Sequence, residues 1–134
     1  MLNKNEKMNK SKNSAPVVHL GEPSFDAEVL ASPQPVLVAF WVPWSRPCQA
    51  LSPVLQELAN TLAGKVKVAT VNADESLGLS LSYDIQSVPT LLCFVEGKPR
   101  LRIIGTATQR AILAALKPLS VKNETAPSAN SRKR

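Results

Sequence analysis

The chain has 134 residues, 44% of them hydrophobic, which is enough for one domain with its own hydrophobic core. Two cysteines cannot form the disulfide framework of a small secreted domain, and no apolar stretch is long enough to span a bilayer. Residues 1–16 are rich in Lys and Asn and contain no apolar core of a secretory signal, so we expect a cytoplasmic protein. The net charge of +6 says little about that domain, because residues 1–16 and 118–134 each carry +3 and the residues between them sum to zero.

The two basic ends lack hydrophobic periodicity. Residues 1–16 contain four Lys and one Glu, and residues 118–134 contain two Lys, two Arg and one Glu. We expect both segments to be disordered tails flanking a single domain at residues 17–117. Contact with nucleic acid through these tails is the alternative to a solubilising role. We favour the solubilising role, because no aromatic side chain interleaves with the basic ones to stack on bases.

The expected elements begin with a short strand at residues 17–20 and a short helix at residues 24–30, with Ser24 as its N-cap. Residues 36–41 are apolar without interruption, which is typical of a central strand buried on both faces. Apolar residues then recur at helical spacing from Leu51 to Leu62. This helix contains Pro53, which we expect to kink it, and Gly64 ends it.

Residues 66–71 are the next strand, and residues 76–82 form a short, weak helix. Residues 90–95 are strand-like, and a glycine-containing turn leads from them into an alternating edge strand at residues 100–103. A final helix begins after Thr108 and is expected to end at Pro118. The order β-α-β-α-β-α-β-β-α predicts an α/β fold with a mixed β-sheet flanked by helices on both faces.

Several motifs fall at defined places in this order. The lead-in Phe-Trp-Val-Pro-Trp at residues 40–44 is followed by Ser-Arg-Pro-Cys at residues 45–48. With Pro53 in the following helix, Val88-Pro89-Thr90 before the fourth strand and Gly105 after the fifth, the chain resembles the thioredoxin family over about residues 20–117. The resemblance implies a thioredoxin-like fold, a Cys-x-x-Cys active site at residues 45–48 and a cis-proline at Pro89.

The chain departs from the family where the chemistry takes place. Ser45 replaces the nucleophilic first Cys, and dithiol exchange needs both sulfurs. Ala39 stands where the family has a buried Asp that shuttles the proton of the second Cys, and Thr70 stands where many members have Lys. A buried carboxylate is costly unless its function requires it, so Ala39 is consistent with the loss of proton transfer. Cys48 then remains as a residual resolving position.

Each candidate residue also has a structural interpretation. Ser45 is either a remnant of the active site or a helix N-cap, and we favour the cap. Serine-hydrolase chemistry lacks a partner, because the only histidine, His19, has no evident Asp to orient it. Cys48 is either inert or reactive. Burial and the absence of a base favour an inert thiol, and Cys93 is expected in the core. Two Cys and one His are too few for a metal site, so we expect neither a metal nor a cofactor.

The resemblance also implies that the family's peptide-binding shelf, formed at the cis-proline, is retained beside Trp44. The first hypothesis is therefore a binding module that holds extended segments of partner proteins through Trp44, Val88 and Pro89, by main-chain hydrogen bonds and without turnover. The second is a thiol–disulfide oxidoreductase with residual monothiol activity through Cys48. The third, an engineered Cys-to-Ser variant of an active enzyme, is disfavoured because it leaves the other two departures unexplained. By resemblance, the groove is also bordered by Arg46, Pro47 and Gly105.

Overall fold

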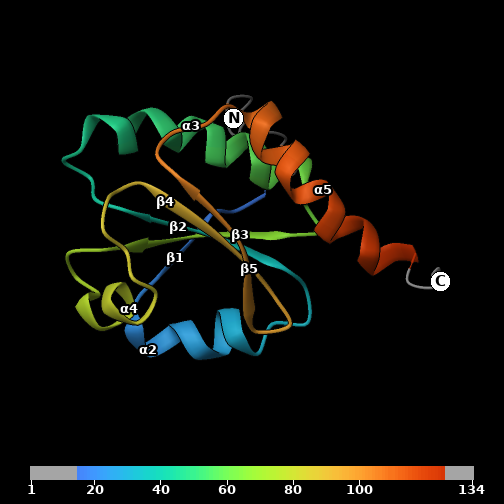
Figure 1. The fold of residues 1–134 in the computed structure, drawn as a ribbon, viewed down its shortest axis with the longest axis horizontal. Coiled ribbons are helices and arrows are strands. Elements are labelled where there is room, and N and C mark those ends of the chain that lie inside the picture. The colour runs from blue at the N-terminus through green and yellow to red at the C-terminus, as the bar shows by residue number, and fades with distance from the viewer. Residues whose placement is uncertain (1–14, 126–134) are drawn as a thin grey trace, which may run out of the picture.

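The computed structural model describes residues 15–125, the last six by backbone alone, so most of both expected tails lies outside the described residues. In chain order the elements are β1 (Val18–Leu20), α2 (Glu22–Phe25), η1 (Asp26–Leu30), β2 (Val36–Trp41), α3 (Arg46–Thr61), β3 (Lys67–Asn72), α4 (Leu77–Ser82), β4 (Thr90–Val95), β5 (Lys98–Ile104) and α5 (Gln109–Thr125) (Figure 1). Since η1 continues α2, this sequence of elements confirms the predicted α/β class.

The strands form one mixed sheet in the order β1-β3-β2-β4-β5. Strand β2 is parallel to β3 and antiparallel to β4, so the apolar run at residues 36–41 lies at the centre, as predicted. Strand β5 is an edge strand, which accommodates Pro99. A two-residue turn joins β4 to β5. Its residues Glu96 and Gly97 have positive φ angles of 54° and 80°, the conformation that a tight hairpin favours.

The sheet lies between two helical layers (Figure 1). Side chains alternate between the faces of a strand, so neighbouring residues of β2 belong to different cores. Leu37 and Ala39 pack with residues of α3 and α5 on one face. Val38 and Phe40 pack with residues of α2 and η1 on the other. The functional site is built where β2 leaves these two cores and α3 begins.

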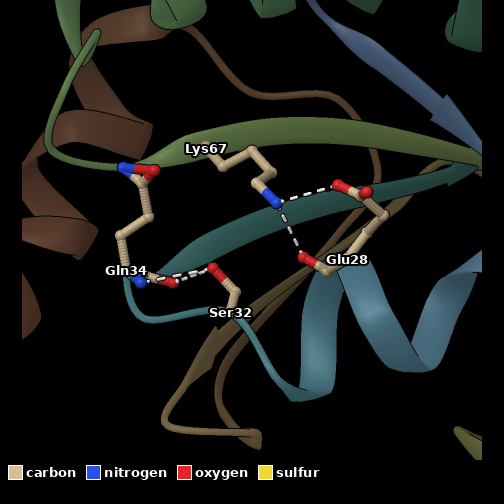
Figure 2. Close-up of polar contacts among 4 residues, drawn as sticks. All are labelled: Glu28, Ser32, Gln34 and Lys67. Carbon is tan, nitrogen blue, oxygen red and sulfur yellow. Dashed lines mark hydrogen bonds and ion pairs between the residues drawn. The ribbon is translucent and has the colours of Figure 1, made fainter.

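Polar contacts attach η1 to the sheet and shape the entry to β2 (Figure 2). Lys67 at the start of β3 donates from Nζ to the carbonyl oxygen of Glu28 at 2.9 Å and lies 3.0 Å from Glu28 Oε1. Ser32 donates from Oγ to the carbonyl oxygen of Gln34 at 2.8 Å, and the Gln34 amide donates back to Ser32 Oγ at 3.2 Å. These contacts fix the turn that delivers the chain into the central strand.

Two predicted helix boundaries are wrong. The first helix begins at Glu22 and not after Ser24, because Pro23 fits the first turn and Ser24 Oγ accepts a hydrogen bond from the Gly21 amide at 3.2 Å. The last helix does not end at Pro118 but runs to Thr125, and Leu119, beyond the proline, packs against the core. Residues 118–125 are therefore helical and not part of a tail. The predicted cap of this helix is confirmed, since Thr108 Oγ1 accepts from the Ala111 amide at 3.0 Å.

Candidate functional site

The site begins at Ser45, the N-cap of α3. Its Oγ accepts a hydrogen bond from the Cys48 amide at 3.4 Å, and its carbonyl oxygen accepts from the Gln49 amide at 2.9 Å. The Gln49 side chain donates to the carbonyl oxygen of Pro43 at 2.8 Å, which holds the loop before the helix. The predicted cap is confirmed. The Ser45 hydroxyl is buried, and its oxygen is engaged with the helix backbone.

Trp44 is the exposed side chain of this loop. Its indole is 71% exposed, yet Nε1 donates to Asp74 Oδ2 at 3.0 Å. The Asp74 amide in turn donates to Asn72 Oδ1 at 2.9 Å, so the turn after β3 fixes the carboxylate. An aromatic side chain that is both exposed and held in one orientation presents a ready-made contact surface.

The segment before β4 is the third part of the site. The peptide bond between Val88 and Pro89 is cis. The Pro89 carbonyl oxygen accepts from the Gly105 amide at 2.8 Å, and Gly105 has a φ angle of +91°. Thr90 Oγ1 donates to the carbonyl oxygen of Ser87 at 2.8 Å. Among the described residues, neither the amide nor the carbonyl of Val88 has a hydrogen-bond partner, so both main-chain groups are available.

Trp44 and Val88 line one hollow of about 280 Å³, which we call the groove. Of the predicted binding residues, only these two line it. Arg46 and Pro47 are exposed in the first turn of α3 and Pro89 is buried, and none of these three residues lines the groove. The other residues that line the groove are Val42, Ala73, Asp74, Leu77, Ser80, Ile85, Gln86 and Ser87.

Cys48 does not open onto the groove. Its side chain is 1% exposed, and it lines a separate hollow of about 290 Å³, the rear cavity, together with His19 and Thr70. Among the described residues, no residue lines both hollows. The structure thus separates the thiol from the exposed indole, although Trp44 and Cys48 are only four positions apart in the sequence.

Cys93 is free and buried in β4, facing α3 and α5. Burial raises the pKa of its thiol from the ordinary 9.0 to about 11, so it is protonated at neutral pH. This is the expected core cysteine. Within residues 15–125, His, Cys, Asp and Glu form no group of three or more that could hold a metal ion. In that same part of the chain, no helix combines the length and apolar character needed to cross a membrane.

The sequence pointed to some of these residues without assigning them to a site. Asp74 follows the end of a parallel strand, where ligand-binding residues of α/β sheets gather, and that signal could have identified it. Leu77 is 65% exposed on α4 and lines the groove. The sequence of so short a helix contains no pattern that predicts this position. His19 and Thr70 meet across β1 and β3, a pairing that depends on strand register.

A family model described as thioredoxin matches residues 16–118. Thioredoxin M5 of rice, a chloroplastic protein, is 42% identical over 100 residues, which cover 75% of this chain and 58% of the relative. Thioredoxin C-2 of Corynebacterium nephridii is 39% identical, over 75% of this chain and 94% of the relative. Thioredoxin of Acidithiobacillus ferridurans is 36% identical, over 75% of this chain and 93% of the relative. The chain thus spans somewhat more than half of the rice protein and nearly all of the two bacterial ones.

Proposed function

Because the chain belongs to the thioredoxin family, which supports a thiol–disulfide oxidoreductase-like function, we propose that it retains the family's peptide-binding role without dithiol turnover. In this proposal the protein holds an extended segment of a partner protein in the groove. Trp44 covers one side of the segment, and the main chain of Val88 pairs with its backbone. Pro89 and Gly105 hold Val88 in place from behind, while Arg46 and Pro47 border the bound segment.

The observation that carries this proposal is the contrast between Trp44 and Cys48. The indole is 71% exposed at the edge of a hollow, whereas the thiol is 1% exposed and opens elsewhere. The amide and carbonyl of Val88 have no hydrogen-bond partner in residues 15–125, and Val88 lines the same hollow as the exposed indole, which suits the addition of an extended strand. The groove therefore supports binding better than it supports attack by a thiol.

The absence of turnover follows from Ser45. A serine hydroxyl is not ionised at neutral pH and cannot form a disulfide with Cys48, so the two-sulfur exchange cannot run. We expect no reduction of insulin disulfides above the background of dithiothreitol alone. Catalysis well above that background would contradict the proposal.

The test of binding is capture of peptides from a library of extended sequences, followed by capture from a lysate at low and moderate salt. We expect Trp44→Ala and Pro89→Ala to abolish capture. Leu81→Ala is the matched control, since Leu81 is 81% exposed on α4 but does not line the groove. Binding that ignores Trp44→Ala, but disappears on deletion of residues 1–14 and 126–134 or with salt, would move the function to the basic ends.

The second candidate function, residual monothiol exchange through Cys48, is separated from the first by alkylation. A thiol that is 1% exposed should react with a bulky maleimide far more slowly in the folded chain than in the unfolded one. Rapid modification of the native protein, located at Cys48 by mass, would favour the redox alternative.

We also propose the cytoplasm as the place of action, by analogy with bacterial thioredoxins, although several relatives are chloroplastic.

A further inference from the structure

The rear cavity lies between β1, β3 and the first turns of α3, and the proposed binding role does not use it. Its volume of about 290 Å³ is close to the lower end of ordinary small-molecule pockets, about 300–1,000 Å³. At about 30 Å³ per water-sized volume, it has room for roughly ten non-hydrogen atoms. Its lining residues are Val17, His19, Trp41, Cys48, Leu51, Ser52, Pro53, Leu55, Gln56 and Thr70.

Strand register explains the open space. His19 lies opposite Thr70, and Thr70 lies opposite Ala39, so the three side chains form one row across β1, β3 and β2 on the face that α3 covers. Two members of this row, Thr70 and Ala39, are small. Of these two, Thr70 lines the cavity, and its small side chain leaves room beneath α3.

The lining selects for a particular ligand chemistry. None of the described residues that line the cavity is Asp, Glu, Lys or Arg, so a charged ligand would lose its hydration without gaining an ion pair. The walls are mainly apolar. His19 is an exposed residue whose Nδ1 lies 2.6 Å from Thr70 Oγ1, which holds the ring in position. Its Nε2 has no protein partner among the described residues and can exchange a hydrogen bond with a ligand or with solvent.

We propose that the rear cavity binds a small, uncharged, mainly apolar organic molecule that exchanges one hydrogen bond with Nε2 of His19. The Trp41 and Leu51 side chains bury the apolar body of the ligand, and Thr70 keeps the imidazole in position. This inference is independent of the partner-binding proposal, because among the described residues the two hollows share no lining residue.

The experiment titrates the full chain with indole, and separately with benzoate as a charged probe of similar size, while the imidazole carbon–proton signals are followed by NMR. His19 is the only histidine of the chain, so these signals need no assignment among alternatives. We expect a saturable shift with indole and binding at least about tenfold weaker with benzoate. Bound indole should also slow alkylation of Cys48 by a small uncharged reagent.

Two variants fill the cavity and keep the reporter. Thr70→Lys adds a long charged side chain, and Val17→Phe fills the space without a charge, so one serves if the other does not fold, as judged by its thermal transition. Both should abolish the saturable shift, whereas Leu81→Ala, at an exposed residue of α4 that lines neither hollow, should leave it unchanged. An unsaturable shift, equal binding of benzoate, or indole binding that survives both cavity variants overturns the proposal. A His19 signal that ignores both probes but changes on deletion of residues 1–14 also overturns it, and assigns the cavity to the chain's own N-terminal segment.

Discussion

Restoring the first sulfur with Ser45→Cys should return only part of the activity of an ordinary thioredoxin. Cysteine at the N-cap loses the oxygen that accepts from the Cys48 amide. That bond is long, 3.4 Å, so the loss of stability should be about 0.5 kcal/mol, at the low end for N-caps. The new thiol would lie at a helix N-terminus, which favours the thiolate, and three positions from Cys48. Some dithiol exchange should therefore appear.

Ala39 should limit the activity of the Ser45→Cys chain. General acid–base assistance is typically worth about 10²–10⁴-fold, which corresponds to about 3–5 kcal/mol of barrier, and Ala39 cannot provide it. We expect Ser45→Cys to fall short of an active relative by a factor in that range. Adding Ala39→Asp should recover much of the difference. Because Ala39 is fully buried, the added carboxyl should lower the free energy of unfolding by about 1–3 kcal/mol and the melting temperature by on the order of 10 °C.

The assay is insulin reduction with dithiothreitol, run beside thermal melts of the same variants. Cys48→Ser in the Ser45→Cys background should return the rate to background, and Cys93→Ala, which removes the core cysteine, should not change it. The buried-acid reasoning is refuted if Ser45→Cys alone equals an active relative. It is equally refuted if Ala39→Asp lowers stability and leaves the rate of the Ser45→Cys chain unchanged.

Four further predictions concern the fold that carries the site. Glu22 Oε2 accepts from the Gly78 amide at 2.6 Å and caps α4 from a distant part of the chain. Glu22→Ala should therefore lower the free energy of unfolding by about 1 kcal/mol and speed amide hydrogen exchange in α4, and unchanged exchange would contradict this. Gly78→Ala places a Cβ 2.7 Å from that oxygen, so it should destabilise the wild type more than the Glu22→Ala chain. The thiol of Cys93 has a pKa of about 11 when folded and 9.0 ordinarily, so stability present below pH 9 should fall as pH rises toward 11, by up to about 2–3 kcal/mol; urea unfolding of Cys93→Val should lack this part of the decline. Lys67→Met should lower the free energy of unfolding more than Glu28→Gln, which should lower it by at most about 1 kcal/mol, because Lys67 also donates to the Glu28 carbonyl oxygen. Equal losses would show that the ion pair alone accounts for the contact.

Much of the fold was predictable because it depends on local patterns. Neighbouring residues determine the apolar run of β2, the helical spacing of α3 and the cap at Ser45. The helix boundaries that were wrong depend on contacts from elsewhere. Pro118 ends a helix by its own chemistry, but Leu119 packs against the core and the helix continues. The rule that proline ends a helix does not take into account the stabilisation from packing Leu119 against the core.

The site was predictable only in part of its residues, and its arrangement was not predictable. The motif identified Trp44 and Cys48 as members of one active site, and the structure places them on different hollows. The cap on α4 shows the same limit, since Glu22 and Gly78 lie 56 positions apart and only the fold brings them together. Long-range pairings of this kind follow from strand order and register, which a single sequence does not specify.

The separation of the two hollows follows from the end of β2. Trp41 and Val42 are neighbours in the chain, yet Trp41 lines the rear cavity and Val42 lines the groove, because alternate side chains of an extended segment point to opposite sides. Helix α3 then begins at the boundary between them. Ser45, at that boundary, is buried and caps the helix, so it exposes no nucleophile toward either hollow. In the proposed function, Ser45 in place of the first Cys therefore removes dithiol exchange, while the groove keeps its exposed indole and the rear cavity keeps its histidine.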